Sequence, residues 1–441
     1  MGARTNRRGF IRRAGGYGLV AYVAARELAS RAEGAVRGHT FGSNVYTRAG
    51  VRPFIMANIP FTFLSATLVW PEVRQAMEEA AHYFVDIVAL QKAVGKRLAE
   101  ISGAESGMIT SGAAGAMATA TAACIAGADP EKIWRLPDSG GMTNRVLMWG
   151  GRSIFDNAIR LAGGRPEVVK TLDELSAAAA RPAAMLYTGY PSDPEPENGS
   201  GKAPPLRAIV SICKQAGVPV FVDAAGGVPP IENLKRYSRM GVDLYAFSGG
   251  KGLMGPQCSG LLLGRRDLIE AALANSSPVE GAVCRPMKVG KEEIIGCLTA
   301  VEKWLTVDLK ALYREQDKKL SRIAAMAETV AGVETEINTR RGSNSFRQLI
   351  VRWDEERFGM TVTECGRRLR EGSPPIEVLS NYNPYLIRVS EFHRKPAADE
   401  KVADKKVPAG SPLTVFSLGL QKGEELIVGR RLRQVLREVR A

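Results

Sequence analysis

A glycine-rich turn between two short apolar runs places the strongest constraint on the fold of this chain. The runs, residues 242–247 and 259–263, have the length and composition of buried strands. The turn between them contains Ser-Gly-Gly-Lys-Gly, with Lys251 as its lysine. Buried strands on both sides predict a fixed position for Lys251, and the flanking glycines let the backbone come close to a bulky ligand.

Two further features lie upstream of this lysine. Residues 218–222 are rich in β-branched side chains and lead directly into Asp223, and parallel sheets place their ligand contacts at such strand ends. Earlier still, a short strand that begins at Gly107 runs into Ser111, Gly112 and Ala113. The backbone N–H groups and the dipole of a small-residue helix start suit a phosphate.

Each feature alone has an ordinary structural explanation, since Lys251 could be a solvated loop residue and Asp223 a helix N-cap. Their order along the chain favours pyridoxal 5'-phosphate (PLP) as a cofactor. In this interpretation the helix start binds the phosphate, and Asp223 keeps the pyridinium nitrogen protonated. Lys251 carries the aldehyde as an imine.

The length of 441 residues predicts one large and one smaller domain. Strands alternate with helices, which predicts an α/β fold with a mostly parallel sheet and helices on both faces. A single long helix is expected from Pro71 to about Gly103, and a helical passage over 291–329. The predicted divisions are a signal-like segment (1–35), a lead-in (36–70), a large PLP-binding domain (71–310), a connecting helix (311–333) and a small α+β domain (334–441).

Composition argues against several other classes of protein. The net charge is +14, but the basic residues are dispersed and form no stripe interleaved with aromatic side chains, so a nucleic-acid partner is not expected. Six cysteines and three histidines show no metal-ligand spacing, and no metal is predicted. No apolar run reaches the roughly 18 residues of a transmembrane span.

The N-terminus carries a targeting pattern. Arg7 and Arg8 are followed by Gly-Phe-Ile and then by a mild, glycine-containing apolar stretch, as in a twin-arginine export signal. The alternative is a basic arm on a cytoplasmic protein. The pattern predicts export of the folded protein to the periplasm.

In this order the motifs resemble the fold-type I PLP-dependent enzymes, and within them the selenocysteine synthase (SelA)-like branch. That branch includes L-seryl-tRNA(Sec) selenium transferase and D-glucosaminate-6-phosphate ammonia-lyase. The resemblance runs from about Arg48 to the C-terminus and is densest in 108–116, 223–225, 247–264 and 285–293. It implies an aspartate aminotransferase-like large domain.

The resemblance also implies roles for particular residues. Lys251 would be the Schiff-base lysine and Asp223 the pyridinium partner. Because enzymes of this fold share their sites between subunits, a homodimer or higher homo-oligomer is expected, with Gln257 and the segment from Arg285 to Lys291 serving a neighbouring site. The remaining implied cofactor contacts are Ser111, Gly112, Ala113, Ser248 and Gln257, and the implied substrate contacts are Arg152, Arg285 and Lys288.

One segment departs from the family pattern. Relatives often have His-Arg-Asn-x-Tyr-Asp-His where this chain has Gly151-Arg152-Ser-Ile-Phe-Asp-Asn157. Two imidazoles and a phenol are therefore missing, which puts transfer of the relatives' activity in doubt. Arg152 remains and suits a substrate carboxylate, although it also suits the surface of a helix.

Three functions follow. The first is a PLP-dependent lyase that removes water or ammonia from a small-molecule amino acid or amino-sugar acid and yields a keto acid. The second is selenium transfer on seryl-tRNA, which an exported protein without an evident tRNA-binding domain would not perform. The third is a PLP-fold binding protein that has lost its chemistry.

Overall fold

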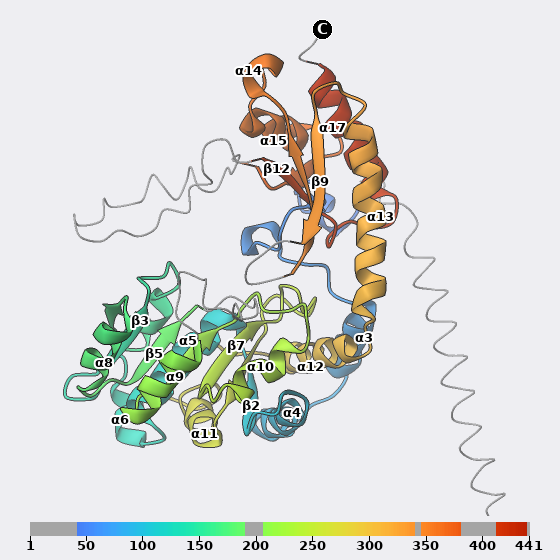
Figure 1. The fold of residues 1–441 in the computed structure, drawn as a ribbon. Helices are drawn as coiled ribbons and strands as arrows, with labels where there is room; N and C mark the ends of the chain where they lie inside the picture. The colour runs from blue at the N-terminus through green and yellow to red at the C-terminus, as the bar shows by residue number, and fades with distance from the viewer. Residues whose placement is uncertain (1–41, 190–205, 340–344, 381–411, 439–441) are drawn as a thin grey trace, which may run out of the picture.

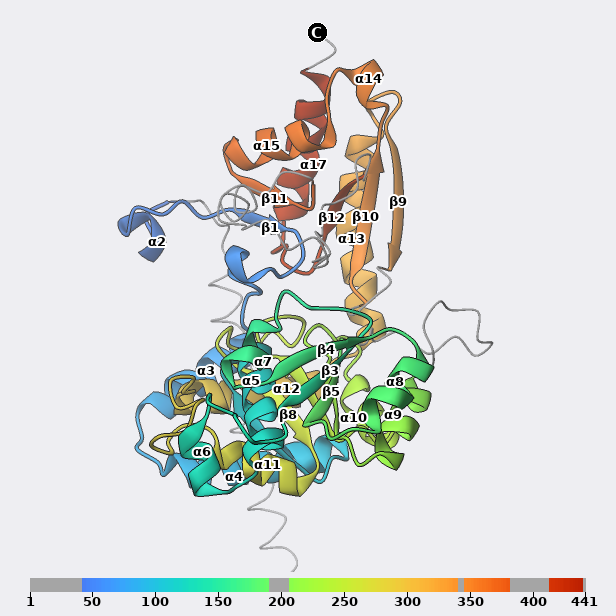
Figure 2. The ribbon, with the colours of Figure 1, turned by 90° about the vertical axis from the view of Figure 1, so that its left-hand side faces the viewer.

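The structure is a computed structural model, and it describes residues 42–189, 206–339, 345–380 and 412–438. These residues form a large domain and a smaller one, placed one above the other in Figures 1 and 2. The domains meet where helix α12 (Lys291–Leu305) is followed by α13 (Leu309–Ala327). The signal-like segment 1–35 lies outside the described residues.

A seven-stranded sheet forms the centre of the large domain, in the order β2-β8-β7-β6-β5-β3-β4. In this sheet β8 alone runs antiparallel to its neighbours. The carboxyl ends of all the other strands therefore meet at one edge, and the predicted mostly parallel sheet is confirmed. The strands are β2 (Ser106–Thr110), β3 (Arg145–Trp149), β4 (Arg165–Val169), β5 (Met185–Thr188), β6 (Val220–Asp223), β7 (Leu244–Ser248) and β8 (Gly260–Gly264).

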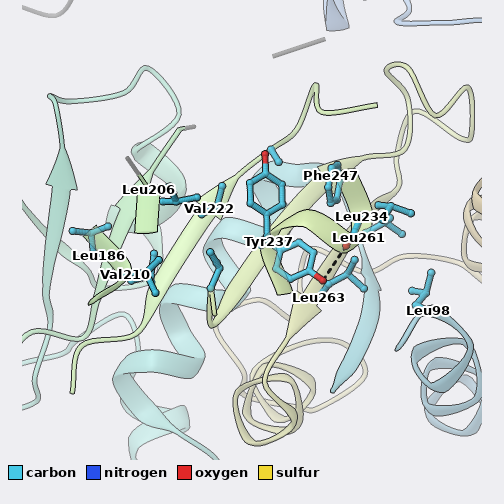
Figure 3. Packing of buried hydrophobic residues seen from close by; sticks show 14 of the residues in the cluster. Leu98, Leu186, Leu206, Val210, Val222, Leu234, Tyr237, Phe247, Leu261 and Leu263 are labelled. Carbon is cyan, nitrogen blue, oxygen red and sulfur yellow. Dashed lines mark hydrogen bonds between the residues drawn. The ribbon is translucent and has the colours of Figure 1, made fainter. Parts of the chain in front are cut away.

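Helices cover both faces of this sheet, as predicted. Alternate residues of each strand enter opposite cores, so Leu186 and Leu263 pack on one face while Met185 and Leu262 pack on the other. Figure 3 shows the first core, in which burial of each leucine contributes about 1.5–3 kcal/mol. The first face carries α4 (Ile87–Ser102), α8 (Leu172–Ala179), α9 (Leu206–Gln215), α10 (Asn233–Arg239) and α12; the second carries α5 (Gly112–Ala126), α6 (Pro130–Arg135), α7 (Asn157–Leu161) and α11 (Arg266–Ala274).

The predicted single helix from Pro71 is wrong. The chain forms α3 (Pro71–Ala81) and then α4, with a break between them. Asp86 starts the second helix, because its carboxylate accepts hydrogen bonds from the backbone N–H groups of Val88 (2.8 Å) and Ala89 (2.9 Å). Phe84 lies in the break with its side chain fully exposed, although its spacing had suggested a buried helix position.

The smaller domain has an antiparallel sheet in the order β12-β10-β9. Its core includes Leu320 and Ile323 of α13, whereas Leu309 and Leu312 at the start of the same helix pack against the large-domain core. Asp308 begins α13 by accepting a bond from the N–H of Ala311 at 3.0 Å. The elements are β9 (Glu334–Thr339), β10 (Arg347–Arg352), α14 (Glu355–Phe358), α15 (Val362–Glu371), β11 (Ile376–Val378), β12 (Leu413–Phe416) and α17 (Glu424–Arg437).

The lead-in contributes to both domains. After α2 (Val45–Arg48), strand β1 (Ile55–Ala57) pairs in parallel with β11, and Ile55 packs in the small-domain core. The chain then passes η1 (Thr62–Leu64) to reach the large domain. None of the helices in the described ranges combines the length and hydrophobicity needed to cross a membrane.

Candidate active site

A cavity of about 810 Å³ lies at the edge of the sheet where the parallel strands end. Residues that follow β2, β3, β5, β6 and β7 line it, together with residues of the lead-in. The strand order thus gathers most of the predicted site around one space. The predicted residues that line the cavity are Ser111, Gly112, Ala113, Arg152, Asp223, Ser248, Lys251 and Gln257.

The phosphate wall is formed by the start of α5. Ser111 is the N-cap residue, and its side chain makes no capping hydrogen bond to the helix. The N–H groups of the first turn have no partner within the helix, so they are available to an anion. Gly260 of β8 supports this wall from behind, because a Cβ there would lie only 2.5 Å from the carbonyl carbon of Gly112.

Asp223 stands at the carboxyl end of β6 with both carboxylate oxygens engaged. The hydroxyl of Tyr187 donates to Oδ2 at 2.9 Å, and the backbone N–H of Ala225 donates to Oδ1 at 3.0 Å. Burial, and then the charge of Asp223, raise the pKa of Tyr187, so the phenol is a neutral donor. Tyr187 was not among the predicted site residues, although its place at the end of a buried strand was a usable signal.

The glycines beside Lys251 lie in close contact with other parts of the chain. A Cβ at Gly252 would collide with the carbonyl oxygen of Val228, and one at Gly249 would collide with the hydroxyl of Ser259. A Cβ at Gly250 would lie 2.6 Å from the Cα of Gln257. These glycines therefore let the turn pack closely against the rest of the protein, and Gly250 also lines the cavity.

Hydrogen bonds from distant segments hold the same turn. The hydroxyl of Thr67 lies 3.1 Å from the carbonyl oxygen of Gly250 and 3.0 Å from that of Lys251. The indole N–H groups of Trp70 and Trp304 both donate to the carbonyl of Leu253, each at 3.1 Å. The lead-in and α12 thus fix the half-buried Lys251 at the cavity wall.

Arg152 lies in the loop after β3, not on the helix surface, since α7 begins only at Asn157. Its Nε donates to Oδ2 of Asp156, a carboxylate that is only 4% exposed. Oδ1 of the same carboxylate accepts from Nε of Arg160 at 3.3 Å. The buried acid anchors the half-buried Arg152 guanidinium where it lines the cavity.

The positions of the missing family side chains fall in the same loop. Gly151 and Phe155 line the cavity, whereas Asn157 is exposed and does not. A Cβ at Gly151 would meet no atom within 4 Å. This wall therefore has open space where relatives often carry an imidazole.

Three other predicted residues have different surroundings. Arg285 and Lys288 are exposed in the loop between α11 and α12 and do not line the cavity of their own chain. That Arg285 and Lys288 contribute to the site of a neighbouring subunit stays a prediction. Gln257 lines the cavity and donates from Nε2 to the carbonyl of Thr62 at 3.1 Å.

Within the described ranges, no His, Cys, Asp and Glu side chains cluster as a metal site.

These residues fit PLP in its three recognition needs. The start of α5 offers N–H donors for the phosphate, and Asp223 offers a fixed carboxylate for the ring nitrogen. Lys251 supplies an amine on the same cavity for the aldehyde. The fit depends on side chains from separate strands that the sheet brings to one edge.

Sequence comparisons lead to the same family. The Aminotransferase class-V model matches residues 194–284, which include Asp223 and Lys251. The chain is 33% identical over 343 residues to 5'-C-glycyluridine monooxygenase-decarboxylase of Streptomyces sp., covering 75% of this chain and 83% of the relative. It is 29% identical over 340 residues to D-glucosaminate-6-phosphate ammonia lyase of Salmonella typhimurium, covering 75% and 87%. An L-seryl-tRNA(Sec) selenium transferase of Moorella thermoacetica is 26% identical over 311 residues, covering 64% and 60%.

Solved structures agree. A structure of D-glucosaminate-6-phosphate ammonia-lyase superimposes with a TM-score of 0.73 at 25% identity, covering 91% of this chain and 100% of that one. A structure of SPT with PLP as its internal aldimine shares the fold at a TM-score of 0.50 and 15% identity, with 88% of each chain covered. The chain therefore belongs to the fold-type I PLP-dependent enzymes of the SelA-like branch, with PLP as its cofactor.

Proposed function

We propose that this enzyme is a lyase that removes water or ammonia from an amino acid or an amino-sugar acid and leaves a keto acid. One observation carries the proposal: Lys251, Asp223 and Arg152 line a single cavity, although Asp223 ends β6 while Lys251 and Arg152 follow β7 and β3. The cavity thus combines an amine for proton transfer, a carboxylate for the cofactor ring and a guanidinium for a substrate anion. Similarity to an ammonia lyase supports the reaction type.

Each residue has a defined task in this proposal. PLP, when bound, supplies an electron sink that makes a bond at the substrate α-carbon easier to break. Asp223 keeps the proton on the ring nitrogen, while Arg152 binds the substrate carboxylate through paired N–H donors. Lys251 Nζ removes the α-proton as a general base and can return a proton to the leaving group. Asp156 keeps the Arg152 guanidinium in place.

Oxidative decarboxylation is the second candidate. The observation that favours it is the 33% identity to a monooxygenase-decarboxylase over 83% of that relative. In such a reaction the substrate carboxylate leaves as carbon dioxide, and dioxygen is the oxidant. Selenium transfer has weaker support, since the selenium transferase of Moorella thermoacetica is 26% identical over 60% of its length.

A substrate panel in the presence and absence of oxygen distinguishes the candidates. PLP-loaded protein is incubated with amino acids, amino-sugar acids and glycyl nucleosides, in air and under argon. A lyase releases keto acid and ammonia equally under both gases, because the imine left after elimination of water is hydrolysed to keto acid and ammonia. An oxidative decarboxylase releases carbon dioxide, consumes dioxygen and stops under argon. PLP-loaded Lys251→Ala controls for reactions of PLP itself, and pure transamination or racemisation would contradict both candidates.

We also propose that the active form is a homodimer or higher homo-oligomer. Support comes from apolar side chains exposed between α3 and α4, where Tyr83 is 65% and Val85 is 52% exposed. A neighbouring subunit would bury this surface and receive Arg285 and Lys288 at its site. Light scattering on active protein tests the proposal, and a fully active monomer would contradict it.

Export through the twin-arginine route is likewise a proposal, and only the Arg7-Arg8 pattern supports it. Residues 1–35 fused to a reporter that matures in the cytoplasm should carry the reporter out of the cell interior. Replacing Arg7 and Arg8 with lysine should keep the reporter inside. An unchanged distribution would favour a cytoplasmic enzyme with a basic N-terminal arm.

A further inference from the structure

Tyr187 connects β5 to the carboxylate at the end of β6. Its side chain is 5% exposed, and its hydroxyl donates to Oδ2 of Asp223 at 2.9 Å. The backbone N–H of Ala225 occupies the other oxygen at 3.0 Å. The plane of the carboxylate is therefore fixed from two directions, by one side chain and one backbone group.

The sheet determines this contact. Tyr187 pairs with Phe221 across β5 and β6, and their rings stack with centroids 6.0 Å apart and planes at 16°. Asp223 follows Phe221 by two positions on the same strand, so it projects from the same face. The stacked ring thus aims its hydroxyl along the sheet toward the strand end, where Asp223 and Tyr187 both line the cavity.

We propose that Tyr187 is a positioning residue for the cofactor, which orients the Asp223 carboxylate toward the ring nitrogen of PLP. A carboxylate oxygen has more than one acceptor site, so Oδ2 can accept from the phenol and still face the pyridinium N–H. Without the phenol, only the Ala225 N–H would hold the carboxylate, so its orientation would be less fixed and its bond to the ring nitrogen would weaken. The inference rests on PLP binding and does not depend on which reaction the enzyme catalyses.

Tyr187→Phe is the direct test, because it removes the hydroxyl and keeps the ring on Phe221. The expected result is about 10-fold weaker PLP binding in equilibrium dialysis, the size of one lost hydrogen bond to a charged group. The ring-nitrogen resonance of ¹⁵N-labelled PLP should also shift at saturating cofactor. Both measurements are independent of turnover.

Tyr245→Phe is the matched control. Tyr245 is also a fully buried tyrosine of the same sheet, and its hydroxyl donates to the carbonyl of Leu234 at 3.2 Å, away from the cavity lining. It should leave the PLP affinity and the ring-nitrogen resonance unchanged. If Tyr187→Phe behaves like this control, the proposal is overturned.

An isosteric second variant protects the test against misfolding. Replacement of Tyr187 by 3-fluorotyrosine preserves the shape and makes the phenol a stronger donor. The ring-nitrogen resonance should then shift in the direction opposite to its shift in Tyr187→Phe. If Tyr187→Phe does not fold, the resonance in the fluorotyrosine protein should still differ from that in the unaltered protein. An unmoved resonance in the fluorotyrosine protein contradicts a positioning role.

Discussion

The turn that carries Lys251 and the loop that carries Arg152 border one cavity but are held in different ways. Gly249, Gly250 and Gly252 of the turn pack directly on other parts of the chain, and Thr67 binds two of its carbonyls. The Arg152 loop is held through one buried carboxylate, Asp156. Its glycines at 150 and 151 have open space beside them.

The turn and the loop therefore differ in how much room they leave for a larger side chain. The PLP side depends on close backbone packing, which tolerates little change in sequence. The Arg152 loop has space for larger side chains at Gly150 and Gly151, and it lacks the imidazoles that relatives often have. Relatives with distinct activities, a monooxygenase-decarboxylase and an ammonia lyase, are both similar to this chain over most of its length.

Adding one methyl group to the Lys251 turn and one to the Arg152 loop should give the largest difference in stability and PLP content. Gly252→Ala forces a Cβ onto the carbonyl oxygen of Val228, so we expect a loss of about 3 kcal/mol or more in the free energy of unfolding, together with loss of PLP. Gly151→Ala meets no atom but has a positive φ, which costs about 1 kcal/mol. Denaturant unfolding measures the stability of both variants, and absorbance measures their PLP content. Equal losses of stability and PLP in the two variants would show that the turn and the loop do not differ in packing.

Replacing Arg152, the cation proposed to bind the substrate, should have the next largest effect. Arg152→Lys keeps the charge but loses the paired N–H donors, so KM should rise roughly 10- to 100-fold with the PLP content unchanged. Arg160→Lys is the control, since Arg160 also pairs with Asp156 but does not line the cavity. A normal KM for Arg152→Lys would show that another residue binds the substrate anion.

The smallest effect is expected from one hydroxyl on the cofactor side. Thr67→Val keeps the shape of the side chain and removes its bonds to the carbonyls of Gly250 and Lys251, which should reduce stability by about 1 kcal/mol. Thr329→Val, at an exposed helix end where Thr329 donates to the carbonyl of Met326, should cost less. A larger loss in the control would mean that Thr67 does not hold the turn.

The sequence predicted the cofactor residues because each has a local signal. A strand precedes Asp223, a small-residue helix follows Ser111, and glycines flank Lys251. Each signal can be recognised within its own short stretch of sequence. The fold then needs only to bring the strand ends together.

Local sequence patterns did not predict the contacts between distant segments. Tyr187 reaches Asp223 only through the pairing of β5 with β6, and Trp70 reaches Leu253 only because the lead-in returns to the large domain. The break before α4 was missed because Phe84 continues an apolar spacing while its side chain is exposed. Periodicity reports spacing along the chain and not which face a neighbour covers.

Lys251, in its closely packed turn, is expected to carry PLP. Borohydride reduction of the PLP-loaded protein, followed by proteolysis and mass spectrometry, tests it directly. We expect one pyridoxyl group, located on the peptide that contains Lys251. A label on any other lysine, or none in PLP-replete protein, would contradict it.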